Sequence, residues 1–236
     1  MKDVILYGRH AVLEALKNPQ RKINRLLVTK ENAAEIKGKI HPEIADKKEF
    51  DRILPPDAVH QGFALFAQPL ENLQIEDVIA LANQKENCCV LILDQVTDPQ
   101  NVGAIIRSAV AFDTLALVMQ DKNSPLENGA MAKASAGMIE HLPVCRVTNL
   151  SRAIGQLKEA GFWTIGMDSH AKQAVSQVNK AGKNAIIMGS EGKGMRRLVE
   201  ENCDLTVRLP ISKNVESLNV STATAIVLYE LNRKEN

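Results

Sequence analysis

Continuous apolar runs alternate with amphipathic stretches from about residue 88 to the end of the chain. A strand with one solvated face alternates apolar and polar residues, so an unbroken apolar run predicts a strand buried on both faces. The stretches between the runs repeat apolar residues at helical spacing. We expect strands at 88–94, 115–119, 142–147, 163–167, 184–188 and 205–211, and helices at 102–112, 128–136, 150–160, 195–201 and 217–231. This order predicts an α/β fold, a parallel sheet with helices on both faces.

The first 68 residues carry a different pattern, with short elements of mixed type. We expect a helix at 7–16, strands at 25–29 and 62–67, and two small helices at 33–40 and 48–54. The stretch from Pro69 to about Ile79 begins with proline and has no strong period, which favours a linker. We therefore predict a small α/β amino-terminal domain over residues 1–68, a linker over 69–82 and a larger domain over 83–236.

Length and apolar runs restrict the class of protein. A chain of 236 residues suits one large domain or two modest ones. The apolar runs fall far short of the ~20 residues that cross a bilayer. The first residues also lack the apolar stretch and cleavage site of a signal peptide. We therefore expect a cytoplasmic protein with no membrane partner.

The four cysteines, Cys88, Cys89, Cys145 and Cys203, form no CxxC pair and have no histidine at metal-ligand spacing. Three of them lie in or beside apolar runs. This pattern favours reduced, buried thiols over zinc or disulfides, so we expect no metal site.

Net charge gives only a weak indication of the partner. The whole chain carries a formal charge of +1. Residues 1–67 hold 12 Lys and Arg against 9 Asp and Glu, whereas the remainder holds 17 against 19. This basic excess fits an RNA-binding surface, and it fits an ordinary solvated face equally well.

A glycine-rich segment, Gly189-Ser190-Glu191-Gly192-Lys193-Gly194, follows an expected strand and precedes an expected helix. Its glycines have the spacing G-x-x-G-x-G, which is not the dinucleotide fingerprint, and no GK[ST] occurs. A glutamate in the loop would also repel a pyrophosphate at the helix start. NAD and ATP are disfavoured, and a tight strand-to-helix turn alone would explain the glycines.

Two further segments carry polar side chains at the start of expected helices. In residues 94–108, Asn101 falls at a helix entrance, and Arg107 lies among packing residues, where it either reaches solvent or meets an anion. In residues 209–221, Ser217, Asn219 and Ser221 begin an otherwise apolar helix. Helix capping explains one such residue and does not readily explain all three.

Together the three segments resemble the motifs of the SpoU (TrmH) family of RNA 2′-O-ribose methyltransferases, in order and in position after successive strands. The matching stretches are Asp-Pro-Gln-Asn-Val-Gly-Ala-Ile-Ile-Arg, then Met-Gly-Ser-Glu-Gly-Lys-Gly-Met, then Leu-Pro-Ile followed by Ser-Leu-Asn-Val-Ser. Residues 7–16, 60–62, 96–99 and 147–150 resemble the subgroup that methylates a guanosine ribose in 23S ribosomal RNA.

The resemblance implies a fold, a cofactor and partners. The family sheet ends in a C-terminal trefoil knot, a rare exception to unknotted topology. S-adenosyl-L-methionine, the methyl donor, sits in that knot, and family members are homodimers that meet through the knotted region. By position, the donor contacts would be Gly189, Leu209, Ile211, Leu218 and Asn219.

The resemblance also assigns roles in the reaction. The family proposal makes Arg107 the base, but a guanidinium is effectively always protonated. Positioning the RNA phosphate and stabilising the developing alkoxide is the physically cheaper role for this residue. Asn101 and Asn219 would orient the arginine or the hydroxyl, Glu191 would pair with Arg107 or aid proton loss, and Ser217 would contact substrate.

The amino-terminal domain would dock RNA, with Arg9 as its candidate RNA-binding residue because arginine readily contacts phosphates and bases. Three alternatives stay open: a tRNA ribose methyltransferase of the same family, a non-catalytic RNA-binding ribosome-assembly protein, and a nucleotide-binding oxidoreductase or kinase. The sequence leaves undecided the RNA and the nucleotide methylated, the general base, and whether the site crosses a dimer interface.

Overall fold

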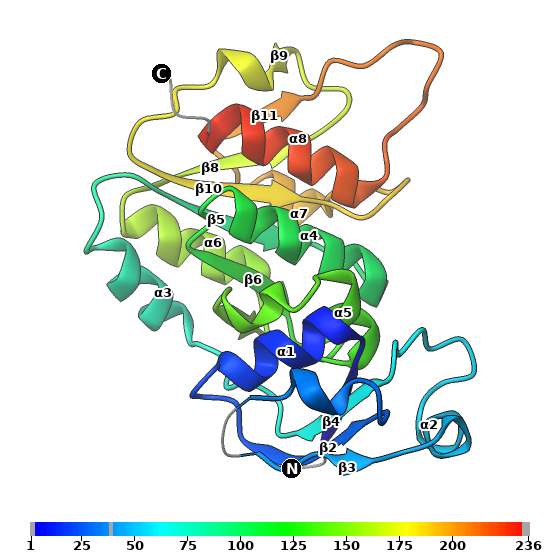
Figure 1. The fold of residues 1–236 in the computed structure, drawn as a ribbon. Helices are drawn as coiled ribbons and strands as arrows, with labels where there is room; N and C mark the ends of the chain where they lie inside the picture. Colours follow the sequence, from blue (N-terminus) through cyan, green and yellow to red (C-terminus); the bar gives the residue numbers. More distant parts are fainter. Residues whose placement is uncertain (1–2, 38–39, 233–236) are drawn as a thin grey trace, which may run out of the picture.

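The larger sheet is built from the apolar runs of the sequence. The computed structural model describes residues 3–37 and 40–232 (Figure 1). In the larger sheet, seven strands pair in the order β7-β6-β5-β10-β8-β11-β9, and every pairing is parallel. These strands are β5 (Cys88–Leu93), β6 (Ala116–Gln120), β7 (Val144–Val147), β8 (Phe162–Met167), β9 (Gln173–Ala174), β10 (Lys183–Met188) and β11 (Leu205–Arg208). The predicted α/β fold is confirmed.

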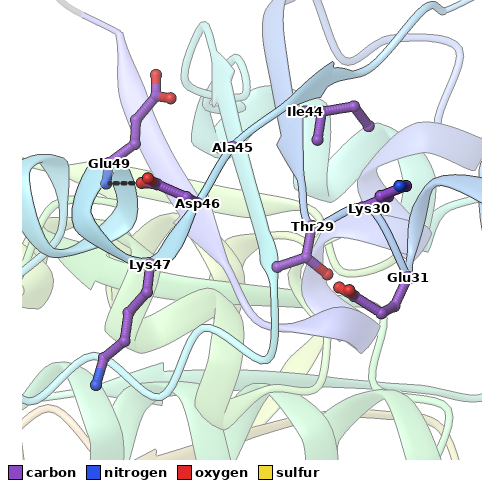
Figure 2. A pocket seen from close by; sticks show the side chains of 8 residues that line it. All are labelled: Thr29, Lys30, Glu31, Ile44, Ala45, Asp46, Lys47 and Glu49. Atoms are coloured by element: carbon purple, nitrogen blue, oxygen red, sulfur yellow. Dashed lines mark hydrogen bonds between the residues drawn. The ribbon is translucent and has the colours of Figure 1, made fainter.

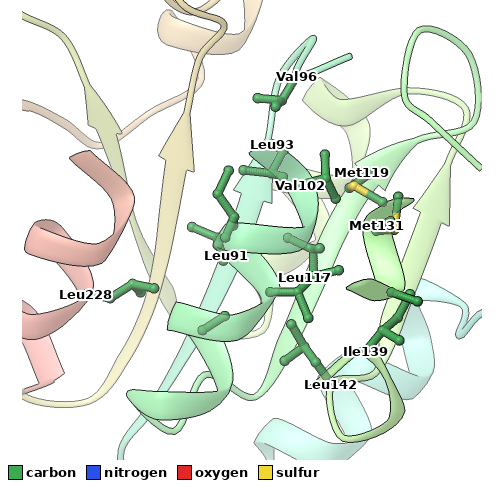
Figure 3. Close-up of a cluster of buried hydrophobic side chains, with 14 of the residues drawn as sticks. Leu91, Leu93, Val96, Val102, Leu117, Met119, Met131, Ile139, Leu142 and Leu228 are labelled. Atoms are coloured by element: carbon green, nitrogen blue, oxygen red, sulfur yellow. The ribbon is translucent and has the colours of Figure 1, made fainter. Parts of the chain in front are cut away.

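Helices cover both faces of this sheet, which is why its strands are apolar along their whole length. One face carries α4 (Pro99–Ala111), α5 (Gly129–Ala134) and α8 (Val220–Asn232); the other carries α3 (Ile75–Ala82), α6 (Leu150–Glu159) and α7 (Arg197–Glu200). Alternate residues of β5 divide between the two cores. Leu91 and Leu93 join Val102 and Leu228 on the first face (Figure 3), whereas Ile92 packs on the second.

The amino-terminal residues form a second, four-stranded sheet in the order β1-β4-β2-β3. Its pairings are antiparallel except that of β2 with β3. The elements are β1 (Val4–Tyr7), α1 (Arg9–Lys17), β2 (Ile23–Val28), a 3₁₀ turn (Ala33–Glu35), β3 (Glu43–Ile44), α2 (Lys47–Ile53) and β4 (Phe63–Ala67). The expected helix at 33–40 is therefore one short turn, although residues 38–39 lie outside the described ones.

Three other boundaries differ from the sequence predictions. β1 was not expected, because an apolar run of four residues is too short to separate from the helix behind it. The closing helix α8 begins at Val220 and not at Ser217, which is exposed. The segment expected as a linker contains α3, whose Ile75, Val78 and Ala82 are buried against the sheet. These three residues have helical spacing in the sequence, but the stretch is too short for the period to be recognised.

The two sheets share one hydrophobic core. Leu6 and Val12 of the smaller unit belong to the same buried cluster as Met131 and Ile139 of the larger one. A Cβ added to Gly129 at the start of α5 would lie 2.4 Å from the ring of Tyr7, so only glycine permits this approach. Because the core continues from one sheet to the other, the two units are packed together and are not separated by a free linker.

A buried ion cluster lies at the same junction. Arg21, whose side chain is fully buried, contacts Glu127 and Glu140 at 2.6 Å each. Its Nη1 also donates to the carbonyl oxygen of Gln68 at 2.9 Å, and the backbone N–H of Leu70 donates to Glu127 at 2.8 Å. The chain that joins the two sheets is therefore tied to both of them.

Within residues 3–37 and 40–232, no helix combines the length and the apolar character needed to cross a membrane. All four cysteines are free thiols, as expected; Cys89 and Cys145 are buried, and Cys88 and Cys203 are partly buried. The trefoil knot stays a prediction.

Candidate functional site

The three motif segments follow β5, β10 and β11. Parallel strands end at the same edge of a sheet, and open α/β folds bind ligands at the carboxyl edge. β5 and β10 are direct neighbours, and β8 separates β10 from β11. In Figure 1 the orange loop after β11 extends outward at that edge before the chain turns into α8.

The first segment enters α4 through a capped start. The Asp98 carboxylate accepts the N–H groups of Gln100 and Asn101 at 3.1 and 3.3 Å, and Pro99 occupies the first turn, where it loses no hydrogen bond. Asn101 therefore lies at the helix entrance, as expected. Arg107 lies further along α4 and is exposed, and no hydrogen bond or ion pair joins it to another described residue.

The second segment is a loop closed on itself. Ser190 and Gly194 exchange backbone hydrogen bonds of 3.1 and 2.9 Å, which leaves Glu191, Gly192 and Lys193 at the exposed tip. A Cβ on Gly189 would lie 2.1 Å from the carbonyl carbon of Gly194, so glycine is obligatory there. The loop therefore presents backbone groups with little side-chain cover.

The third segment supplies the residue that joins the other two. The Asn219 side-chain oxygen accepts the backbone N–H and the hydroxyl of Ser221 at 2.9 and 2.6 Å, which caps α8. The side-chain amide of Asn219 donates to Asn101 Oδ1 at 3.0 Å and lies 3.4 Å from Glu191 Oε2. One asparagine thus both starts a helix and brings the three motifs together.

The remaining candidate residues are placed less tightly. Ser217 and Ile211 are exposed, Leu218 is half-buried, and Leu209 is half-buried against the first core cluster. The expected pair between Arg107 and Glu191 is not formed among the residues that the structure describes; Glu191 instead lies 3.4 Å from the side-chain amide of Asn219.

The RNA-docking candidate Arg9 is already paired. Its Nε and Nη2 both lie 2.7 Å from Glu35 Oε2, at a side-chain exposure of 44%. An exposed ion pair of this kind is weak. Breaking it to free the Arg9 guanidinium for RNA therefore costs little free energy.

Sequence reasoning did not single out two residues beside the site. Asp94, directly after β5, is fully buried and bonded to Arg196, which follows the glycine-rich loop and Met195. The available signal was an ionisable residue that ends an apolar run. Its partner lies 102 residues away and was not identifiable from spacing.

The amino-terminal unit has a hollow of its own (Figure 2). It lies beside β3 and the start of α2, and its lining is polar and of mixed charge: Thr29, Lys30, Glu31, Ile44, Ala45, Asp46, Lys47 and Glu49. Three carboxylates against two ammonium groups do not suit a phosphate, so this hollow is a poor candidate for the RNA site. In the described part of the chain, no three His, Cys, Asp or Glu side chains gather as a metal site would require.

Fold and site together define an α/β enzyme whose ligand loops follow parallel strands. The model of the SpoU rRNA methylase family matches residues 89–229, and the model for RNA 2′-O ribose methyltransferase substrate binding matches residues 5–73. The chain therefore belongs to the SpoU family, and it is an RNA methyltransferase with an RNA substrate-binding domain.

Known relatives agree with this assignment. YacO of Bacillus subtilis, assigned to the TrmH family tRNA/rRNA methyltransferases, is 36% identical over 97% of this chain and 95% of its own. The AdoMet-bound rRNA methyltransferase of Sinorhizobium meliloti has a similar fold, with a TM-score of 0.80 at 21% identity over 98% of this chain and 87% of its own. The TrmH/SpoU tRNA modifying enzyme of A. aeolicus reaches a TM-score of 0.55 at 22% identity over 67% of this chain and 80% of its own.

Proposed function

We propose that this protein transfers a methyl group from S-adenosyl-L-methionine to a ribose 2′-hydroxyl of RNA. The observation that carries the proposal is the Asn219 amide, which connects Asn101 and Glu191 at the carboxyl edge of the sheet. Asn101 and Asn219, which are 118 residues apart in the chain, meet there through polar side chains, which folding alone does not require.

The residues present fit the donor. The absence of a Cβ at Gly189 lets the loop close on Gly194, so that backbone N–H and C=O groups face a ligand directly. Leu209, Ile211 and Leu218 of the third motif would offer apolar surface for the donor; Leu209 and Leu218 are half-buried and Ile211 is exposed. When bound, S-adenosyl-L-methionine supplies an activated methyl group on a positively charged sulfur.

The protein's own residues would align the hydroxyl and manage charge. Arg107 is exposed and unpaired among the described residues, so its guanidinium is available for an RNA phosphate and for the oxygen that becomes negative during transfer. A donor in that role contributes ~3 kcal/mol. Asn101 and Asn219 orient the hydroxyl, Glu191 accepts its proton, and Ser217 contacts the RNA backbone.

The proposed substrate is a guanosine of 23S ribosomal RNA. In support, the rRNA methyltransferase of S. meliloti covers 98% of this chain, whereas the tRNA modifying enzyme of A. aeolicus covers 67%. The substrate-binding model over residues 5–73 fits an RNA-docking role for the amino-terminal domain, 1–68, including Arg9. A tRNA ribose is the second candidate, since YacO is described as a tRNA/rRNA methyltransferase.

We further propose a cytoplasmic homodimer that meets through the knotted region, as the family resemblance implies. Light scattering on the purified protein would measure this. A monomeric mass at micromolar concentration would overturn the dimer and leave the donor assignment untouched.

The experiment that tests the proposed function is a map of methylated riboses in rRNA and tRNA from cells with and without this protein. We expect one guanosine ribose of 23S rRNA to lose its methyl group. Loss at a tRNA position instead would select the second candidate. If no ribose changes and calorimetry detects no S-adenosyl-L-methionine binding, the protein is a non-catalytic RNA-binding member.

A further inference from the structure

Asp94 connects the two ends of the glycine-rich loop. Its backbone N–H donates to the carbonyl oxygen of Met188, the last residue of β10, at 2.8 Å. Its carboxylate accepts the backbone N–H of Arg196 at 2.8 Å. Met188 and Arg196 stand immediately before and after residues 189–195. One residue outside the loop therefore fixes both of its ends.

The side chain of Arg196 also binds the Asp94 carboxylate. Its Nε and Nη2 each lie 2.8 Å from Asp94 Oδ1, while the backbone N–H of Arg196 binds Oδ2. Both carboxylate oxygens are thus occupied by one residue, in charge-assisted bonds of good length. The Asp94 side chain has 0% exposure, whereas that of Arg196 has 39%.

A fully buried carboxylate is an expensive way to stabilise a fold. Pairing a charge in the interior roughly offsets its desolvation, and apolar residues of similar size usually serve stability as well or better. A buried ion pair does fix one arrangement of the chain, because a shifted loop leaves the carboxylate uncompensated.

Asp94 also begins the first motif. Gln95, the next residue, adopts a left-handed backbone with φ 59°, and the chain then runs to the Asp98 cap and Asn101. Asp94 therefore links the glycine-rich loop to the segment that enters α4 at Asn101. These two parts contribute Glu191 and Asn101 to the Asn219 contacts.

We propose that Asp94 and Arg196 are a positioning pair that holds residues 189–195 in the shape that binds the methyl donor. They act through the loop and are not themselves catalytic. The inference rests on the proposed donor site. It goes beyond that site by assigning donor affinity to two residues outside the donor contacts.

The principal test compares Arg196→Lys with wild type. Lysine keeps the charge and the backbone N–H but loses the forked donor, so the protein should fold. We expect the dissociation constant for S-adenosyl-L-methionine, measured by calorimetry, to rise at least tenfold. The single-turnover rate at saturating donor should fall much less, because the reacting groups are unchanged. Hydrogen exchange should accelerate in the peptide that covers residues 189–195.

Asp94→Asn gives an independent measurement, because it keeps the size of the side chain, removes the charge and replaces one of the two acceptor oxygens with an NH₂ donor. The matched control is Arg197→Ala. Arg197 is the next residue, is 85% exposed and is paired with Glu201 at 3.2 Å, so its loss should change neither affinity nor exchange. If Asp94 has a purely structural role, Asp94→Asn should lower the melting temperature without changing the donor affinity of the folded fraction.

Donor affinity within twofold of wild type in folded Arg196→Lys would overturn the inference. If the proposed function itself is wrong, the wild-type protein will bind no S-adenosyl-L-methionine, and this result distinguishes the two failures.

Discussion

At the residue scale, Arg107 is the strongest single test of the proposed chemistry. It is exposed on α4 and unpaired in the described part of the chain, so its removal disturbs little of the fold. We expect Arg107→Ala to reduce single-turnover methyl transfer by about 10²- to 10³-fold. Donor affinity by calorimetry should stay within about twofold. Near-normal transfer would remove Arg107 from the mechanism.

Arg107→Lys separates the two roles proposed for this residue. If Arg107 positions a phosphate through paired bonds, lysine keeps the charge, loses the fork and retains a trace of activity with an unchanged pH profile. If Arg107 is the base, lysine has the lower intrinsic pKa and should shift the pH-rate profile to lower pH. Single-turnover rates across a pH series would decide between them, and we expect the unshifted profile.

The thiols give a second residue-scale prediction. Burial raises the pKa of Cys89, Cys145 and Cys203 to about 12 and raises that of Cys88 as well. Because the thiolate is the reactive form, native protein at pH 8 should react only slowly with a thiol reagent. All four thiols should react at once in denaturant. A fast-reacting thiol in the native state would contradict the raised thiol pKa values.

Asn219 shows how far sequence reasoning reaches at this scale. Capping was expected to explain one polar residue at the start of the last helix, and the Asn219 oxygen does cap α8. The same side chain also belongs to the candidate site through its nitrogen. Asp94 and Arg196 were not identified because a buried ion pair depends on three-dimensional proximity, and the only local signal was that Asp94 ends an apolar run.

At the element scale, the apolar runs predicted the six longer strands of the larger sheet because both faces of that sheet are covered. The elements that the sequence did not predict are very short or merge with a neighbouring pattern. β9 has two residues, β1 is separated from α1 by Gly8 alone, and α3 makes only two turns within a stretch that begins with proline. α8 was placed three residues early, because polar residues before a helix resemble its first turn.

The glycine-rich loop permits an element-scale prediction. In Gly189→Ala the new Cβ would lie 2.1 Å from the carbonyl carbon of Gly194 and 2.3 Å from the nitrogen of Met195. Both are backbone atoms of the closed loop, so the loop must open. We expect donor affinity to fall at least about tenfold, which equals about 1.4 kcal/mol.

Gly155→Ala is the matched control for that substitution. Gly155 lies inside α6, and a Cβ there meets nothing within 4 Å. Alanine should leave donor affinity unchanged and stabilise the protein by about 0.5–1 kcal/mol. Equal donor affinity in Gly189→Ala and Gly155→Ala would show that the closed loop is not needed for binding.

At the scale of the whole molecule, the shared core changes how the amino-terminal domain can be tested. Deleting residues 1–68 would expose Met131 and Ile139 and would leave Glu127 and Glu140 without Arg21. Lost RNA binding after such a deletion would therefore not distinguish docking from misfolding. The sequence could not reveal this, since Arg21 is more than a hundred residues from both of its partners.

Point substitutions at the ion cluster measure how much the junction between the two units contributes to stability, without removing a whole domain. Arg21→Met keeps the apolar volume but leaves two buried carboxylates without their cation, which costs about 3–5 kcal/mol. We expect urea unfolding at pH 7 to report a loss of this order. The variant Arg21→Met with Glu127→Gln and Glu140→Gln removes the unpaired charge and should recover a large part of that loss.

The pH dependence of Arg21→Met tests the cause of the loss. Burial already raises the pKa of Glu127 in wild type, against the opposing pull of Arg21, and loss of the guanidinium raises it further. A carboxyl whose folded pKa exceeds its unfolded value favours the folded state below the unfolded pKa, and that benefit is lost as pH rises through the folded pKa. The difference in free energy of unfolding between Arg21→Met and wild type should therefore become smaller from pH 7 to pH 5. The corresponding difference between the triple variant and wild type should not. A difference for Arg21→Met that stays constant over this interval would assign the loss to packing and not to buried charge.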